Sequence, residues 1–392
     1  MPLQCELARL PALHIGQGTL ARLPGLLAPA ERILLVRGGA SLDDTAEVQT
    51  VLQRLRDDGR ELHEQRVQRE PSVEDIQEAC ATWRGAGIDA VLAIGGGSAL
   101  DTGKALAGLL HSGTDLLDHL EGVGRGHPWP GGRLRLVMVP TTAGTGSETT
   151  MNAVIGGELD GQAFKKSLRH PDLMADHAIV DPVCSRACPP ARSAACGMDA
   201  CTQLLESLLS TQASPLTDGI ARAGLAALAP ALAQSVTDGS DLEARAGVAF
   251  GACCSGIALA HAGLGPVHGF APWMGAWYGI DHGVACGALL AASLAVTLEA
   301  LRERAPAHPA RDRIAWFGRL VTADDRLGRD AAEDAAVAFL DELTETCGLP
   351  RLGVLGLDAA ACRRLSGADK LVRNNPVALD RDELLAILQR RL

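Results

Sequence analysis

Hydrophobic residues in the first half of the chain alternate between the spacing of buried strands and the spacing of helices. Short continuous apolar runs open residues 32–42, 89–110 and 135–148, as expected for buried strands. Residues 47–59 and 73–87 instead carry apolar side chains at helical spacing, and both segments stop at a glycine. Strands that alternate with helices predict a parallel sheet covered by helices on both faces.

The pattern changes near Pro182, beyond which alanine and leucine recur at helical periods. Residues 218–236 and 331–348 are examples, and strand signals disappear. We therefore predict an α/β domain with a parallel sheet over residues 1–181 and an all-α domain over residues 182–392. Because no low-complexity linker separates the two, a cleft at their interface is the expected ligand site.

Composition narrows the class of partner and the compartment. The chain has 36 Lys and Arg against 47 Asp and Glu, a net charge of −11, which argues against a nucleic-acid partner. Its 11 cysteines form no CxxC pair, so we interpret them as reduced thiols of a cytoplasmic protein. The N-terminal sequence has no apolar signal-peptide core. No uncharged apolar run reaches about 18 residues, so no membrane span is expected.

The sequence AIGGGSALDTGKA joins a predicted strand to a predicted helix. Its three glycines allow the backbone to approach a charged group closely, and the helix N-terminus offers free N–H groups and a positive dipole end. The pyrophosphate of a dinucleotide suits such a loop, although a plain strand-to-helix turn would use the same residues.

A second loop, VPTTAGTGSE, gathers four hydroxyls after the next predicted strand. Hydroxyls at the carboxyl end of a strand can bond phosphate, ribose or a carboxamide. The alternative is a loop whose hydroxyls satisfy only their own backbone. The candidate contacts are Thr141, Thr142, Thr145 and Ser147.

A third loop, VRGGAS, ends the first predicted strand with Gly38, Gly39 and Ser41. A nucleotide fold that uses NAD often places an acid there for the ribose 2′-hydroxyl, and this loop has none. A 2′-phosphate would be accepted, and Arg37 nearby would help to hold it. The loop therefore favours NADP(H) over NAD(H), the alternative being a plain glycine turn with Arg37 in solvent.

Polar residues in the helical half have spacings that suit a metal site. Asp199 and Gln203 stand four apart in a helical pattern, so they share one face. His268 and His282 flank an aromatic-rich segment, and imidazole is a common ligand for zinc and iron. Together these residues would hold a divalent ion, although Asp199 and Gln203 can equally form the polar edge of a core helix. His261 would lie about 10 Å from His268 along one continuous helix, too far to share an ion.

Nearly the whole chain resembles the iron-containing (group III) alcohol dehydrogenases, whose distant relatives include glycerol dehydrogenase and dehydroquinate synthase. Six segments stand in the order and at the spacing of that family: GGGSALDTGKA, VPTTAGTGSET, AIVDP, GMDACTQLLE, GPVHGFAPWMGAWYGIDHG and RNNPVAL. The resemblance implies an N-terminal dinucleotide-binding α/β domain and an all-helical C-terminal domain of the dehydroquinate synthase-like fold. It also implies an active site between the two domains.

The resemblance assigns roles in a metal site for Fe²⁺ or Zn²⁺, and the amide at Gln203 adds Mn²⁺ as a further candidate. The ligand positions of the family fall on Asp199, Gln203, His268 and His282. Gln203 stands where most members have histidine, Pro272 replaces a pocket histidine, and His261 replaces an asparagine. The candidate catalytic residues are Asp199, His268, His282 and His261.

The resemblance also assigns cofactor contacts. They fall on Gly96, Gly97, Ser98, Asp101, Thr141, Thr142, Thr145 and Ser147. The family's lysine that reaches the ribose or nicotinamide falls on Lys165, with Lys166 as the adjacent alternative. The loop of Gly38, Gly39 and Ser41 is similar to that of members that prefer NADP(H).

The implied reaction is hydride transfer between NAD(P) and a small alcohol, aldehyde or ketone, and a homodimer is the usual assembly. Gln203 leaves two variants open, a metal-assisted dehydrogenase and a metal-independent reductase of the maleylacetate reductase type. A non-redox lyase of the dehydroquinate synthase type and a non-catalytic nucleotide-binding protein are the remaining alternatives.

Overall fold

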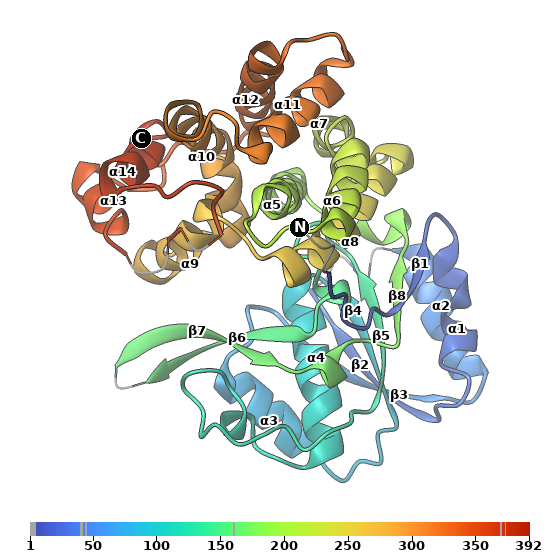
Figure 1. Ribbon diagram of the computed structural model, residues 1–392. Coiled ribbons are helices and arrows are strands. Elements are labelled where there is room, and N and C mark those ends of the chain that lie inside the picture. Colours follow the sequence, from blue (N-terminus) through green and yellow to red (C-terminus); the bar gives the residue numbers. More distant parts are fainter. Residues whose placement is uncertain (1–4, 40–41, 44, 160, 369–370, 373) are drawn as a thin grey trace.

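The chain folds into an α/β region followed by a helical region (Figure 1). The computed structural model describes residues 5–39, 42–43, 45–159, 161–368, 371–372 and 374–392. This arrangement confirms the predicted fold class of a parallel-sheet α/β part with an all-α part.

Six strands form one sheet in which every pairing is parallel, in the order β1-β8-β5-β4-β2-β3. They are β1 (Ala12–Ile15), β2 (Arg32–Arg37), β3 (Glu61–Arg66), β4 (Ala90–Gly95), β5 (Arg135–Pro140) and β8 (His177–Val180). The apolar runs of the sequence predicted β2, β4 and β5, which lie inside the sheet. Strands β1, β3 and β8 were not predicted, because β3 is a polar edge strand and the other two are only four residues long.

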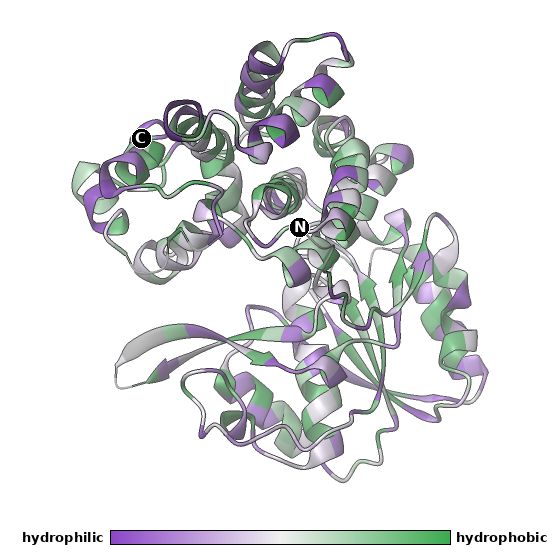
Figure 2. Ribbon diagram, in the orientation of Figure 1, coloured by the Kyte–Doolittle hydropathy of each residue, from purple (hydrophilic) through white to green (hydrophobic). Residues whose placement is uncertain are grey.

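Alternate residues of the inner strands face two different layers of helices. On β2, Ile33 and Leu35 pack with helices α1 (Leu23–Leu26) and α2 (Ala46–Asp57). Residues Leu34 and Val36 pack on the other face with helices α3 (Val73–Trp83) and α4 (Gly97–Ser112). Figure 2 shows hydrophobic residues along the central strands, as a sheet buried on both faces requires.

A two-stranded antiparallel hairpin projects from the α/β region (Figure 1). It consists of β6 (Asn152–Leu159) and β7 (Gln162–Arg169), and the sequence patterns did not predict it. Short 3-10 turns lie between the larger elements: η1 (Thr19–Arg22), η3 (Leu116–Asp118), η4 (Ser147–Thr149), η5 (Pro171–Leu173) and η6 (Pro182–Ser185).

The helical region is built around α5 (Pro190–Leu209), which packs against α6, α8 and α10. Beyond Pro182 the described residues contain helices and no strand, as the loss of strand signals predicts. The division at residues 181 and 182 stays a prediction. The other helices are α6 (Pro215–Leu228), α7 (Leu232–Thr237), α8 (Leu242–Ala262), α9 (Pro266–Tyr278), α10 (His282–Arg304), α11 (Pro309–Thr322), α12 (Arg329–Thr346), α13 (Ala359–Leu365) and α14 (Arg381–Gln389).

Two of these helices, α8 and α10, are long and apolar enough to cross a membrane by length and composition alone. No uncharged run in either helix reaches the length of a membrane span, because Arg245 interrupts α8 and Glu299 interrupts α10. Inside the fold, 67% of the apolar window of α8 and 83% of that of α10 is buried. This burial against other helices is what core helices of a globular protein show.

Candidate active site

A cleft of about 520 Å³ lies between the loops at the carboxyl ends of the strands and the helical region. One wall holds eight residues of the three predicted loops: Gly38, Gly39, Gly96, Gly97, Ser98, Thr141, Thr142 and Thr145. The other wall holds Asp199 of α5 and His282 of α10. Ligands of open parallel sheets bind at this edge, so one cavity connects the candidate cofactor loops to the candidate metal ligands.

The loop between β4 and α4 is shaped for close approach of a ligand. A Cβ atom on Gly97 would stand 2.9 Å from Cγ2 and 3.0 Å from Oγ1 of Thr145, so a side chain there would force the Thr145 side chain or its loop to shift. Helix α4 begins at this glycine, and no side chain among the described residues caps it. Its first N–H groups are therefore available to an anion, and this loop fits the pyrophosphate of a dinucleotide.

Asp101 and Ser147 tie the loops together and do not line the cleft. The hydroxyl of Ser147 donates to Oδ1 of Asp101 at 2.6 Å, and the backbone N–H of Val154 donates to Oδ2 at 2.9 Å. The buried ammonium of Lys104 lies 3.0 Å from the same carboxylate. Direct contact of Asp101 and Ser147 with a cofactor stays a prediction, since the structure gives both a supporting position.

The role predicted for Arg37 is wrong in both of its versions. Its side chain is neither in solvent nor in the lining of the cleft, because it is 5% exposed and pairs with two carboxylates. Oδ1 of Asp43 lies 2.5 Å from its Nη2, and Oε2 of Glu64 lies 3.7 Å from its Nη1. The partner Glu64 comes from β3, a strand that the sequence patterns did not predict.

Arg69 is a cation that lines the cleft together with Gly38 and Gly39. It is exposed and forms an ion pair with Asp75 at 2.9 Å. Ser41, the third predicted contact of this loop, lies outside the described residues. Lys165 of β7 does not line the cleft and pairs at 2.6 Å with Glu70, which does.

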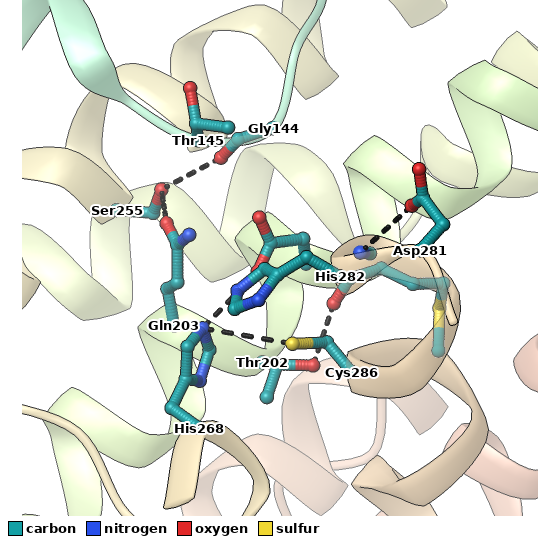
Figure 3. Close-up of polar contacts among 12 residues, drawn as sticks. Gly144, Thr145, Thr202, Gln203, Ser255, His268, Asp281, His282 and Cys286 are labelled. Atoms are coloured by element: carbon teal, nitrogen blue, oxygen red, sulfur yellow. Dashed lines mark hydrogen bonds and ion pairs between the residues drawn. The ribbon is translucent and has the colours of Figure 1, made fainter. Parts of the chain in front are cut away.

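Side chains of α5, α9 and α10 converge at the helical wall of the cleft (Figure 3). Oδ1 of Asp199 lies 3.2 Å from Nε2 of His268 and 3.8 Å from Nε2 of His282. Cys286, one turn after His282 on α10, completes the group. The ligand atoms of these four residues all lie within 4.8 Å of one another. This mixture of carboxylate, imidazole and thiol fits a divalent transition metal.

Gln203, the fourth ligand position implied by the family, is held by a different partner. Its Oε1 accepts a hydrogen bond of 2.6 Å from the hydroxyl of Ser255 on α8 (Figure 3). The side chain is 4% exposed, so this bond satisfies an otherwise buried amide oxygen. The structure therefore brings Asp199, His268 and His282 together and gives Gln203 a bond to α8.

Glu206 orients the ring of His268, and sequence reasoning missed it. Its Oε2 lies 2.7 Å from Nδ1 of His268, and its Oε1 accepts from the backbone N–H of Val267 at 2.7 Å. A carboxylate that holds one ring nitrogen leaves the other to face a metal. Glu206 is seven residues after Asp199, two turns along α5, so helical spacing offered a signal.

The electrostatics of the group favour positive charge at its centre. Its contacts with Cys286 and Asp199 raise the pKa of His282 to about 9, against the effect of burial. Burial would lower the pKa of His268, but Cys286, Asp199 and Glu206 together raise it well above its usual value. Burial likewise acts to raise the pKa of Asp199, and its contacts with His268 and His282 outweigh this and lower it.

His261 lies outside this group. Its Nε2 accepts a hydrogen bond from the backbone N–H of Ala8 at 2.9 Å, and its Nδ1 lies 2.7 Å from the carbonyl oxygen of Ile257. Helix α8 ends at Ala262 and α9 begins at Pro266, so the continuous helix assumed between His261 and His268 does not exist. A catalytic role for His261 stays a prediction.

Comparison with known proteins gives matches over most of the chain. Residues 11–182 match the model of iron-containing alcohol dehydrogenases, and residues 193–392 match that of the C-terminal region of Fe-containing alcohol dehydrogenases. The solved structure of a 1,3-propanediol oxidoreductase covers 99% of this chain and all of its own chain, with a TM-score of 0.88 at 26% identity. An alcohol dehydrogenase from Oenococcus oeni gives a TM-score of 0.86 at 25% identity, covering 99% of this chain and 100% of that one.

Curated relatives give the same picture at higher identity. The chain is 36% identical over 264 residues to long-chain-alcohol dehydrogenase 1 of Geobacillus thermodenitrificans, a match that spans 67% of this chain and 65% of that protein. It is 33% identical to the probable alcohol dehydrogenase EutG of Escherichia coli, over 81% of this chain and 76% of that one. It is 30% identical to the sulfoacetaldehyde reductase of Bilophila wadsworthia, over 82% of each.

Proposed function

This chain belongs to the iron-containing alcohol dehydrogenase family, and from that premise we propose that it interconverts an alcohol and an aldehyde or ketone by hydride transfer, with NADP(H) preferred. The observation that carries the proposal is the single cleft that connects the glycine loops to Asp199 and His282. A bound nicotinamide supplies the hydride donor or acceptor, and a bound divalent metal supplies a Lewis acid for the substrate oxygen.

The loops at the carboxyl end of the sheet would hold the cofactor. The uncapped N-terminus of α4 and the glycines beside it take the pyrophosphate. The hydroxyls of Thr141, Thr142 and Thr145 on the same wall can bond ribose or carboxamide groups. Arg69 beside Gly38 supports the preference for NADP(H), since a guanidinium binds a 2′-phosphate well.

The helical wall would hold the metal and the reacting end of the substrate. Asp199, His268 and His282 supply a carboxylate and two imidazoles, which suit Fe²⁺, Zn²⁺ or Mn²⁺. Glu206 keeps Nε2 of His268 directed at this position by bonding the other ring nitrogen. The substrate oxygen would then lie at this wall, opposite the cofactor loops.

A metal-independent reductase is the second candidate, and the bond between Gln203 and Ser255 is the observation that favours it. In that version the ligand set lacks the fourth family position. Asp199→Asn separates the two candidates, because it removes a metal ligand and leaves the cofactor loops intact. A metal-assisted enzyme would lose its bound metal and most of its activity in this variant, whereas the activity of a metal-independent reductase would be the same with and without a chelator.

The test of the proposed function follows NADPH and NADH absorbance with a panel of aldehydes and alcohols. The protein is first stripped with a chelator and then supplied with Zn²⁺, Fe²⁺ or Mn²⁺. We expect turnover that depends on added metal and is faster with NADPH. Absence of net NAD(P)H turnover with every substrate, despite cofactor binding, would refute the proposal, and full activity without metal would refute its metal part.

The panel should pair neutral long-chain aldehydes with sulfonate-bearing aldehydes. Arg192 lines the cleft on the same wall as Asp199, and it is loosely paired with Asp281 at 3.5 Å. A preference for the anionic aldehyde that disappears in Arg192→Gln would assign this cation to the substrate. An unchanged preference in that variant would exclude the assignment.

A cytoplasmic homodimer is the proposed setting. All eleven cysteines are free thiols, which supports a reducing compartment. The dimer rests on the family resemblance, and light scattering of the purified protein tests it.

A further inference from the structure

The thiol of Cys286 lies inside the metal-ligand group although the family pattern does not assign it a role. Its Sγ is 3.7 Å from Nε2 of His268, and its ligand atom lies within 4.8 Å of those of Asp199 and His282. The side chain is fully buried, so Cys286 is not a surface thiol. Figure 3 shows it directed toward the two histidine rings.

Helix α10 supplies two members of the group from one face. His282 and Cys286 are four residues apart in its first turns, a spacing that places both side chains on the same side. Asp199 approaches from α5 and His268 from α9. Four possible donors from three helices thus lie within 4.8 Å of one another, and four is the number of ligands that a tetrahedral site requires.

The amide of Gln203 is a poorer fourth donor than this thiol. Its Oε1 is already engaged at 2.6 Å by Oγ of Ser255, whose one hydroxyl proton is shared between this amide and the carbonyl oxygen of Ala252 at 2.8 Å. An amide oxygen is also neutral, whereas a thiolate carries a full negative charge and binds borderline-soft ions strongly.

We infer that Cys286, and not Gln203, is the fourth protein ligand of the metal site, and that this site selects Zn²⁺ over Fe²⁺. The inference rests on the proposed function, because it concerns the same cleft. On binding, a metal–sulfur bond forms, the thiol proton passes to solvent and the ion releases water, with no change of oxidation state. The charges of Asp199 and Cys286 then balance a divalent ion, and zinc tolerates a fifth donor, which leaves room for a substrate oxygen.

Cobalt substitution tests the inference without relying on activity. Protein loaded with one equivalent of Co²⁺ should show a near-ultraviolet thiolate-to-cobalt charge-transfer band beside the visible ligand-field bands. Cys286→Ser should abolish the charge-transfer band and weaken Zn²⁺ binding more than roughly tenfold in a chelator competition. The variant should also lose the preference for Zn²⁺ over Fe²⁺.

Two matched variants locate the sulfur and exclude the amide. Cys196→Ser removes another thiol that lines the same cleft, and it should keep the charge-transfer band. Gln203→Leu tests the amide in either of its orientations and should keep both the band and the Zn²⁺ affinity. NADPH binding and circular dichroism, measured on all three variants, establish that each is folded.

The outcomes separate the inference from the function on which it rests. Co²⁺ that binds wild-type protein with ligand-field bands but no charge-transfer band overturns the role of Cys286 and leaves a metal enzyme standing. A large loss of affinity in Gln203→Leu, with none in Cys286→Ser, overturns it as well. Wild-type protein that binds no Co²⁺ and no Zn²⁺ overturns both the inference and the metal part of the proposed function.

Discussion

Oε2 of Glu206 lies 2.7 Å from Nδ1 of His268 and joins α5 to the first turn of α9. The same carboxylate accepts a hydrogen bond from the backbone N–H of Val267, so it fixes both the helix start and the ring. With Nδ1 engaged, Nε2 is the ring atom that faces Asp199, at 3.2 Å. The orientation of His268, a candidate metal ligand, therefore depends on Glu206, which is not itself a candidate ligand.

Glu206→Gln should lower the affinity for Zn²⁺ roughly 10- to 100-fold, the usual cost of losing such an outer partner. A neutral amide can still fill the space, but it holds the imidazole less firmly and makes it a weaker donor. A chelator competition on the metal-free protein measures the change. Glu243→Gln, at an exposed glutamate of α8, is the control and should bind Zn²⁺ like wild type. Equal affinity in both variants would contradict the role of Glu206.

Gly97→Ala should raise the KM for NADPH by roughly tenfold or more, which corresponds to a loss of about 1.4 kcal/mol in binding free energy. The added methyl would meet Cγ2 of Thr145 at 2.9 Å and push the second loop away from the cofactor. Thr145→Ser deletes that methyl group, so adding it to Gly97→Ala should recover part of the loss. Steady-state kinetics with both cofactors measure the effect, and a double variant no better than Gly97→Ala would contradict the steric explanation.

Arg69→Ala should weaken the binding of NADPH and leave the binding of NADH unaffected, because only NADPH carries a 2′-phosphate. Hydrogen bonds to charged groups contribute about 1.5–3 kcal/mol, so the KM for NADPH should rise by roughly tenfold or more. The measurement is the ratio of kcat/KM for the two cofactors. Arg66→Ala is the control, since Arg66 pairs with Glu64 at 2.6 Å on β3 and does not line the cleft. A ratio that stays the same in Arg69→Ala would refute the assignment.

Strands could be predicted from the sequence only where burial on both faces requires a continuous run of apolar residues. Strands β2, β4 and β5 carry continuous apolar runs because both of their faces are covered. Strand β3 reads as ELHEQR, since an edge strand needs no such run. That omission also hid one of the two carboxylates that pair with Arg37, because Glu64 lies on β3.

The candidate metal site was likewise predictable only in part. Asp199 and Gln203 share a helix face, which spacing shows, but a spacing says nothing about which partner each side chain meets across the fold. Gln203 meets Ser255 of α8, whereas Cys286 meets His268. The thiol stood one turn from His282 in the sequence, yet in a chain with 11 scattered cysteines nothing distinguished it. Only the convergence of three helices does so.

The protonation of one buried acid, Glu148, should make the free energy of unfolding decrease as the pH rises from about 5 to about 7. Burial raises the pKa of this carboxyl from 4.5 to about 7, which its backbone bond and the charge of Lys104 only partly offset. The folded state therefore keeps a proton that the unfolded chain releases above about pH 4.5. The stabilisation is complete below that pH and is lost as the pH rises through about 7, with a slope of at most about 1.4 kcal/mol per pH unit.

Glu148→Gln removes this titration. The free energy of unfolding of the variant should therefore increase relative to that of wild type as the pH rises from about 5 to 7. Above about pH 8 the difference should become constant, because Glu148 is ionised in both states of the wild-type protein. Urea unfolding at each pH measures the difference and cancels the groups that both proteins share. Glu158→Gln, at an exposed glutamate of β6, should follow wild type throughout. Parallel curves for Glu148→Gln and wild type would show that this carboxyl does not titrate inside that window.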